Sequence, residues 1–306
     1  MTPATAARLL RPVLPDAPVS DVVARTGGRL SAVHEVRLVG RPPLVVKVYA
    51  HEWRWKQEKE RHVYGLLGEH GRGAVPEVLH CAPDGGPDGR PFTVMTCLDG
   101  VPLSEVSGGM DAATLRRLYG QVGAHLAAVH RVAQEEFGYV VDGVVDPEPT
   151  NAAYMARQFD KKLAEHAALG GDPALHDAVR RAADRGAAAF GRCAAPVLCH
   201  DDLHEGNVLV DQVRGRWEVT GFVDVENAVA ADPLLDLAKT HLYSVRGDAD
   251  KRAGLLEGYG TLPDDAEERL ALYELYHALE LWDWFASTGD TGPLPGIADD
   301  LWRLAR

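Results

Sequence analysis

One segment of the chain concentrates residue types that could carry chemistry. It reads His200-Asp201-Asp202-Leu203-His204-Glu205-Gly206-Asn207, and Asp224 follows seventeen residues after Asn207. In such a set one carboxylate can orient a hydroxyl group, while an amide and a second carboxylate hold Mg²⁺. Phosphoryl transfer needs this division of labour, because positioning and charge neutralisation supply most of its catalysis.

Short apolar runs must position these side chains. Residues 197–199 lead into the segment, residues 208–210 leave it, and the run 219–223 ends at Asp224. The polar residues 211–216 include a glycine and predict a hairpin turn between the last two runs. We therefore expect Asp202 and Asn207 on one loop, and Asp224 at the tip of a neighbouring strand.

A lysine in the first third of the chain fits the same chemistry. Lys47 lies in the apolar run 44–49, a predicted strand, where a lysine is costly to bury unless it is paired or faces a ligand. Glu58 and Glu60 lie on the helix expected over 53–68 and could reach it. A lysine held by a helix glutamate and directed at nucleotide phosphates is a kinase arrangement. The alternative is an edge-strand lysine that points into water.

Two further features have a chemical and a plainer interpretation. Gly27-Gly28, with Ser31 after them, could form a turn over phosphates, although paired glycines are often simply a turn. His200 and His204 could be metal ligands of a hydrolase, but no H-E-x-x-H and no second dedicated cluster accompanies them. We expect both histidines to support the loop through hydrogen bonds instead.

Composition limits the class of protein. The 306 residues are 46% hydrophobic and 25% charged, an ordinary globular composition, and this length suits one bilobal unit or two domains. The net charge of −13 argues against a nucleic-acid partner. The four cysteines show no metal-ligand spacing and no paired framework, as in reduced cytosolic proteins.

Targeting and membrane segments are not evident in the sequence. Residues 1–15 lack the apolar stretch of a signal peptide, and no run reaches the roughly 18 apolar residues of a membrane helix. We expect a soluble, cytoplasmic monomer or homodimer with no membrane partner.

The periodicity of the chain changes near residue 99. Before it, four strands are expected over 30–38, 44–49, 75–79 and 92–95. After it, helical spacing predominates: helices are expected over 111–132, 152–190 with a break at 170–173, 233–245, 251–259 and 265–287. This pattern predicts an α+β fold: an N-terminal lobe over 1–98, a hinge at about 96–100, and a mostly helical lobe over 99–306.

Taken together, these segments resemble the aminoglycoside phosphotransferase family of protein-kinase-like small-molecule kinases. That family's H-G-D-L-H-x-G-N corresponds to residues 200–207, its I-D-[WF]-E-like strand end to 223–226, and its G-D-P-x-x-D-L-A to 231–238. The resemblance covers about residues 27–259 and is specific, because many spaced elements occur in one order. It implies a bilobal protein-kinase-like fold with a small antiparallel N-lobe sheet.

The resemblance also implies roles for single residues. Asp202 would be the catalytic base or hydroxyl-orienting residue, and Asn207 with Asp224 would bind Mg²⁺. Lys47 paired with Glu60 would hold the α- and β-phosphates of ATP or GTP. The backbone of Thr96 to Leu98 would bind the purine, and Asp236 would brace the catalytic loop.

Two departures from the family pattern stand out. Asp201 and Ala231 replace glycines, so we expect that the backbone at Asp201 does not need a positive φ. Downstream of Asp224 the chain reads Val225-Glu226 rather than Phe-Gly, and no A-P-E follows, which argues against a protein kinase. Glu226 is either a substrate-facing carboxylate or part of a surface network.

The acceptor should bind among the C-terminal helices. Glu280, Trp282 and Asp283 could hold a cationic or sugar-like ligand, or the indole could pack the core while the acids face solvent. We expect a kinase that phosphorylates a hydroxyl of a small molecule such as an antibiotic, which would give resistance or self-protection. The alternatives are a kinase of an amino alcohol or sugar, and a non-catalytic nucleotide-binding regulator.

Overall fold

The computed structural model describes residues 1–16, 18–25, 31–69 and 74–306, and its contacts divide them into two compact units. The first comprises Met1–Val106, Val140–Gly143 and Asn207–Glu226; the second comprises Ser107–Tyr139, Val144–Gly206 and Asn227–Arg306. The hairpin after the 200–207 segment therefore packs with the N-terminal residues, whereas the sequence-based division placed all of 99–306 in one lobe.

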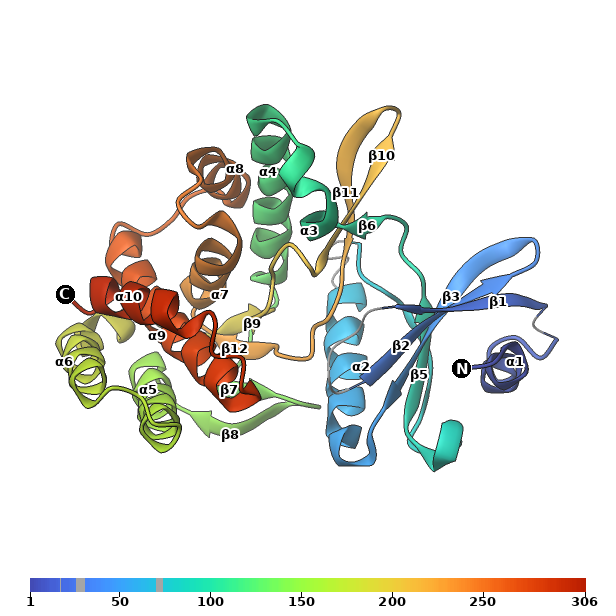
Figure 1. Ribbon diagram of the computed structural model, residues 1–306, viewed down its shortest axis with the longest axis horizontal. Coiled ribbons are helices and arrows are strands. Elements are labelled where there is room, and N and C mark those ends of the chain that lie inside the picture. The colour runs from blue at the N-terminus through green and yellow to red at the C-terminus, as the bar shows by residue number, and fades with distance from the viewer. Residues whose placement is uncertain (17, 26–30, 70–73) are drawn as a thin grey trace. The chain divides into compact units, whose positions relative to one another are not determined.

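The first unit is built on a five-stranded antiparallel sheet with the order β1-β2-β3-β5-β4 (Figure 1). Its strands are β1 (Val19–Arg25), β2 (Ser31–Leu38), β3 (Arg41–Tyr49), β4 (Val78–Ala82) and β5 (Phe92–Thr96). Helix α2 (Arg54–Glu69) connects β3 to β4 and contacts both strands. This connection brings a helix face to the strand that carries Lys47.

A short N-terminal helix covers part of this sheet. Helix α1 (Pro3–Leu10) begins at the capping side chain of Thr2, which accepts the N–H of Thr5. Its Leu9 and Leu10 are buried in one cluster with valines of β2, β3 and β5. The burial of these leucines holds a helix of only two turns, which alone would be marginal in water.

A three-stranded antiparallel ribbon completes the first unit, with β6 (Val101–Pro102), β10 (Val208–Val213) and β11 (Arg216–Phe222). The turn between β10 and β11 uses Arg214 and Gly215, both with positive φ, as a tight hairpin requires. Asp224 follows the end of β11 by two residues.

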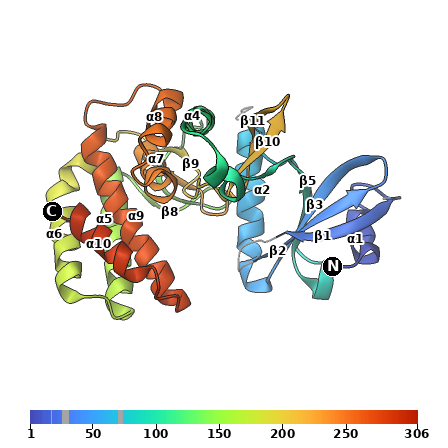
Figure 2. The ribbon, with the colours of Figure 1, turned by 45° about the horizontal axis from the view of Figure 1, so that its top comes forward.

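The second unit combines a small four-stranded sheet, of order β8-β7-β12-β9, with helices (Figure 1 and Figure 2). The strands are β7 (Phe137–Val140), β8 (Val144–Glu148), β9 (Val197–Cys199) and β12 (Val229–Ala231). The main helices are α4 (Ala112–Val129), α5 (Asn151–Ala168), α6 (Pro173–Phe190), α7 (Pro233–Thr240), α8 (Ala249–Tyr259), α9 (Ala266–Thr288) and α10 (Leu294–Leu304). A short π-helical segment, His241–Val245, follows α7.

Helices α4 and α8 approach closely along a seam of glycines, and they lie side by side in both views (Figure 1 and Figure 2). A methyl group on Gly123 would collide with the carbonyl of Leu255, and one on Gly258 would collide with the carbonyl of Gly120. Glycine at these helix positions costs about 1 kcal/mol each relative to alanine, a cost that the close packing offsets. The seam fixes the position of α8 against α4.

The α+β class expected from the sequence is confirmed, with a small antiparallel sheet first and a mostly helical remainder. The helices over 112–129 and 151–190, with a break between α5 and α6, are also confirmed. Strands β1, β6, β7, β8 and β12 and helices α1, α3 (Leu103–Val106) and α10 were missed, and β4 begins at Val78 rather than at Val75. Among the described helices, none has both the length and the apolar character needed to cross a bilayer.

Candidate active site

The 200–207 segment is a loop between two strands, as expected. Strand β9 leads into it, and β10 begins directly after Asn207. The loop crosses the division between the units: residues up to Gly206 belong to the second unit, and Asn207 belongs to the first.

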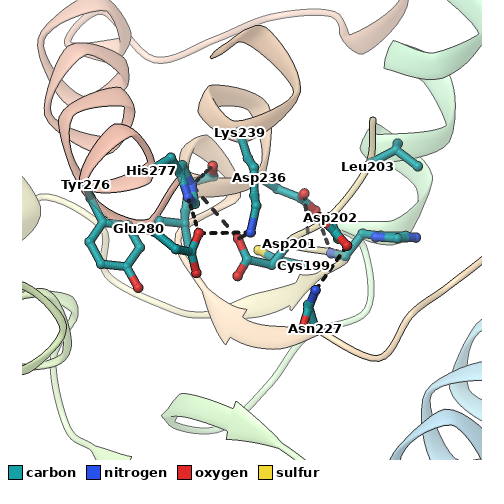
Figure 3. Close-up of polar contacts among 12 residues, drawn as sticks. Cys199, Asp201, Asp202, Leu203, Asn227, Asp236, Lys239, Tyr276, His277 and Glu280 are labelled. Carbon is teal, nitrogen blue, oxygen red and sulfur yellow. Dashed lines mark hydrogen bonds and ion pairs between the residues drawn. The ribbon is translucent and has the colours of Figure 1, made fainter. Parts of the chain in front are cut away.

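The carboxylate of Asp202 is oriented by an amide. Asn227 donates from Nδ2 to Oδ2 of Asp202 at 3.0 Å (Figure 3). His204 Nε2 lies 3.9 Å from Oδ1 of the same carboxylate, and its Nδ1 accepts the backbone N–H of Gly206 at 3.0 Å. The hydrogen bond from Asn227 thus holds Oδ2 of Asp202. His204 stabilises the turn at Gly206 through its Nδ1.

Asp236, on α7, binds the backbone of the two residues that precede Asp202 in the chain. Its carboxylate accepts the N–H of His200 at 2.6 Å and the N–H of Asp201 at 3.1 Å, and His130 Nε2 lies 3.2 Å away. Burial would raise the pKa of Asp236, but the hydrogen bond and charge of His130 and the N–H of His200 hold that pKa below its ordinary value. His200 itself is buried.

Glu205 anchors the loop to neighbouring helices, a contact that sequence reasoning missed. Its carboxylate accepts from Ser107 Oγ and Tyr119 OH, each at 2.8 Å, and from Lys251 Nζ at 2.7 Å. Its backbone N–H donates to Ser244 Oγ at 3.1 Å. Tyr119 lies on α4 and Lys251 on α8, so the glycine seam between these helices places both donors.

The expectation for Asp201 was wrong. Its φ is +52°, in the left-handed region that favours glycine. Aspartate enters this region more readily than most residues, and here the N–H of Asp201 is bonded to Asp236. The loop keeps the backbone shape that the glycine of the family pattern would give.

In the first unit, Lys47 is buried on β3 and forms an ion pair with Glu60 of α2. Tyr49 OH donates to the other oxygen of Glu60 at 2.8 Å, and Lys47 Nζ lies 3.5 Å from Oδ1 of Asp224. Burial alone would lower the pKa of Lys47, but Glu60, Asp224 and other nearby acids raise it well above its ordinary value. The lysine therefore faces acids and not bulk water.

Asp224 sits in a special backbone position beside Asn207. Its φ is +68°, and its N–H donates to Tyr64 OH at 3.0 Å. The preceding N–H, of Val223, donates to the carbonyl of Asn207 at 3.0 Å. The side chain of Asp224 remains about one-third exposed, at 31%. Asn207, directly before β10, and Asp224, two residues after β11, carry side-chain oxygen atoms, and such hard donors suit Mg²⁺.

Glu226 points into a cluster of charges in the same unit. Its carboxylate lies 2.9 Å from Lys56 Nζ and 3.6 Å from Lys47 Nζ. Oxygen atoms of Glu60, Asp224 and Glu226 lie within 4.8 Å of one another, so three carboxylates are gathered around two ammonium groups. Lys56 was not predicted as a site residue from the sequence. It lies four residues before Glu60, so the two share one helix face, and this spacing could have identified it.

The expected nucleotide-contacting residues lie in the first unit. Ser31 begins β2 opposite Tyr49, and Gly27 and Gly28 lie outside the described residues. Thr96 ends β5; its N–H donates to the Glu77 carbonyl and its hydroxyl accepts the N–H of Glu77. Leu98 is half-buried, and its side chain lies against Gly221.

The three expected acceptor residues on α9 lie in different surroundings. Glu280 accepts from Lys239 Nζ at 3.0 Å and pairs with His277 Nδ1 at 3.2 Å. Trp282 is buried, with its ring centroid 4.3 Å from that of His166 on α5. Asp283 is 3% exposed, and burial raises its pKa to about 7, against the lowering effect of Lys162. Trp282 and Asp283 thus contribute to the interior, and only Glu280 is connected to the loop.

Comparison with known proteins finds a matching family model and several similar structures. A family model described as the phosphotransferase enzyme family matches residues 21–273. Aminoglycoside phosphotransferase APH(4)-Ia is structurally similar, with a TM-score of 0.75, 18% identity, and coverage of 99% of this chain and 98% of that chain. A thermostable mutant of that enzyme, in ternary complex with ADP and hygromycin B, gives a TM-score of 0.75 at 19% identity, with coverage of 99% and 98%.

A second group of similar structures consists of putative fructosamine-3-kinases. The protein from Thermobifida fusca YX-ER1 gives a TM-score of 0.68 at 21% identity, covering 97% of this chain and 98% of its own. That from Haemophilus somnus 129PT gives 0.71 at 13% identity, with coverage of 100% and 98%. At such low identities the likeness concerns the fold, and the expected kinase-like fold is confirmed.

Proposed function

Because the chain belongs to the phosphotransferase enzyme family, we propose that it is a Mg²⁺-dependent kinase that phosphorylates a hydroxyl group of a small molecule. The observation that carries this proposal is the buried contact of Lys47 with Glu60 and Asp224. A strand lysine held by a helix glutamate beside a metal-binding aspartate is the arrangement that phosphoryl transfer from a nucleotide needs.

The nucleotide side of the reaction belongs to the first unit. Lys47 offsets charge on the α- and β-phosphates of ATP or GTP, and Glu60 keeps its ammonium group in place. Asn207 and Asp224 hold Mg²⁺, which when bound neutralises phosphate charge and so favours departure of the nucleoside diphosphate. Ser31 and the backbone of Thr96 to Leu98 contact the nucleotide.

The acceptor side belongs to the second unit. The hydroxyl oxygen forms a bond to the γ-phosphorus as the bond from that phosphorus to the β-phosphate oxygen breaks. Asp202 aligns the hydroxyl and accepts its proton, and Asn227 fixes the orientation of the carboxylate that does so. His200, His204 and Asp236 support the loop that carries Asp202.

The short connection after Asp224 favours a small acceptor over a protein acceptor. Strand β12 begins at Val229 and α7 at Pro233, so the chain passes within a few residues from Asp224 to a packed helix. A protein kinase carries its activation segment and peptide platform at this point. Glu280, close to the loop through Lys239, is the α9 residue best placed to meet an acceptor.

Two classes of small molecule are candidates for the acceptor. An antibiotic acceptor, with resistance or self-protection as the role, fits the acidic chain and the similarity to aminoglycoside phosphotransferases. A glycated amine or an amino alcohol is the second candidate, and the similarity to fructosamine kinases favours it.

The direct test is to incubate the purified protein with Mg²⁺ and either ATP or GTP in the presence of hygromycin B, kanamycin, a fructosamine or choline. We expect one compound to gain the mass of one phosphate group. Transfer that needs no divalent cation would contradict the role of Mg²⁺. Slow hydrolysis of nucleotide with no acceptor modified in a broad panel would contradict the proposal and favour the nucleotide-binding regulator.

The role of Asp202 has its own test. Asp202→Ala should lower kcat by about 10²- to 10⁴-fold, the range for a lost general base, and leave nucleotide binding largely intact. Turnover by steady-state assay and nucleotide affinity by calorimetry measure the two effects. Asp177→Ala, at an exposed position on α6, is the control. Unchanged turnover in Asp202→Ala would remove Asp202 from the mechanism.

A further inference from the structure

The left-handed backbone at Asp201 needs an explanation, since this residue directly precedes Asp202. A non-glycine residue in this conformation costs about 1 kcal/mol or more. The two neighbouring carboxylates point in opposite directions: Asp202 lies toward Asn227, and Asp201 lies toward Lys239 and Glu280 (Figure 3). The turn thus separates a reacting acid from a buried one.

The buried acid faces basic side chains from two helices. Asp201 is 8% exposed, and its Oδ1 lies 3.8 Å from Lys239 Nζ on α7 and 3.9 Å from His277 Nε2 on α9. Burial raises the pKa of Asp201 to about 7, while the charges of Lys239 and His277 oppose that rise. The carboxylate is therefore stable as an anion only while a cation stays beside it.

Lys239 is itself held in place. It is 4% exposed, and its Nζ lies 3.0 Å from Oε2 of Glu280. His277 Nε2 donates to the carbonyl of Leu235 at 2.9 Å, and its Nδ1 lies 3.2 Å from the same Glu280 oxygen. These contacts tie α7 to α9 beneath the loop, so the ammonium group beside Asp201 has little freedom to move.

We propose that Asp201 and Lys239 are positioning residues for the phosphoryl transfer: their buried ion pair locks the left-handed turn and so sets the direction of the Asp202 carboxylate. This inference rests on the proposed role of Asp202. It goes beyond the bracing by Asp236, which holds backbone N–H groups, because it assigns a function to a side chain at a position where the family pattern has glycine.

The test compares three variants. Asp201→Asn keeps the shape and the tolerance of left-handed backbone but removes the charge. Asp201→Gly frees the backbone and also removes the charge. Lys239→Met removes the ammonium group. With Mg²⁺-ATP hydrolysis to water as the probe, each should lower kcat about 10- to 100-fold, as small misplacements of a reacting group do, with KM for ATP unchanged.

The double variant Asp201→Asn/Lys239→Met should be no slower than the worse single variant, because both changes remove one interaction. Glu274→Gln is the matched control: it removes a 2.7 Å contact with His241 that also joins α9 to the segment after α7. It should lower the melting temperature as Asp201→Asn does, and leave kcat unchanged.

Several results would overturn the inference. Full activity in Asp201→Gly would mean that only the backbone turn matters. Multiplying losses in the double variant would mean that the two residues act independently. Loss of kcat in Glu274→Gln equal to that in Asp201→Asn would mean that helix packing alone is responsible. If the unmodified protein neither hydrolyses Mg²⁺-ATP nor phosphorylates any compound of the acceptor panel, the proposed function is overturned, and this inference with it.

Discussion

At the scale of single residues, the carboxylate of Asp202 is bonded to a side chain that lies outside the 200–207 segment. Asn227 lies three residues after Asp224 and donates to Asp202 Oδ2. A hydrogen bond to a charged group contributes about 1.5 to 3 kcal/mol. We expect this hydrogen bond to hold one carboxylate oxygen of Asp202 in place.

Asn227→Ala should therefore lower kcat by about tenfold or more, with KM for nucleotide unchanged. Asn227→Asp should lower it further, because a second carboxylate would face that of Asp202 and repel it. Steady-state kinetics measures both effects, and Gln212→Ala, an exposed amide in the β10–β11 hairpin, is the control. Equal activity in the alanine and aspartate variants would argue against a role for this contact.

At the scale of elements, α2 links the lysine strand to the segment after β11. Glu60 and Lys56 lie one turn apart on its buried face, and they contact Lys47 and Glu226 respectively. A shift of α2 would separate both pairs at once. The position of the helix and the charge balance around Asp224 are therefore coupled.

Glu226→Gln should destabilise the protein by about 1 to 3 kcal/mol, because two largely buried lysines lose an anionic partner. Chemical denaturation measures this loss. Glu58→Gln, on the same helix, removes a 3.8 Å surface contact with Arg54 and should cost less than about 0.5 kcal/mol. Adding Lys56→Met to Glu226→Gln should recover part of the lost free energy of unfolding, because the unpaired lysine is removed. A further loss of stability in the double variant would contradict a direct ion pair between Lys56 and Glu226.

At the scale of the whole molecule, stability responds to pH through two opposing sets of buried carboxyls. Hydrogen bonds and nearby charge lower the pKa of Asp236 despite its burial, so its contribution is present at neutral pH and is lost on acidification. Burial raises the pKa of Asp283 to about 7. Ionising Asp283 in the folded protein is therefore costly, and that cost grows as the pH rises from about 4 through 7.

Asp283→Asn should stabilise the protein more at pH 8 than at pH 5, because the cost of the buried carboxyl grows from about pH 4 up to its raised pKa of about 7. The raised pKa of Asp283 limits the stabilisation at pH 8 to about 4 kcal/mol. Thermal unfolding at both pH values measures the difference. A stabilisation that is the same at pH 5 and pH 8 would show that charge burial at Asp283 is not its cause.

Nucleotide binding should also stabilise the whole molecule. A ligand at a hundred times its Kd adds about 2.7 kcal/mol to the free energy of unfolding. Mg²⁺-ATP should therefore raise the melting temperature more than ATP with a chelator, and Asp224→Ala should remove the difference. Asp211→Ala, in the same hairpin and exposed, is the control. An unchanged Mg²⁺ response in Asp224→Ala would place the metal elsewhere.

The order of elements around the loop was predictable because it is local. Strand β9, the loop, β10, the turn at Gly215 and β11 follow one another in 26 residues, 197–222, and hydrophobic runs and turn residues mark each boundary. Helix α2 was also expected, but its buried face was not. Lys56, Gln57, Lys59 and Glu60 are all buried, so charged and polar residues lie where the helical pattern would place apolar ones.

By itself the sequence determined the kind of chemistry, since Asp202, Asn207 and Asp224 lie close along the chain and their types suit phosphoryl transfer. Only the tertiary structure decided which partners these residues have. Lys56 meets Glu226 across 170 positions, and Asp201 meets Lys239 and His277. Such pairs depend on how helices pack, and packing is set by the whole core and not by local spacing.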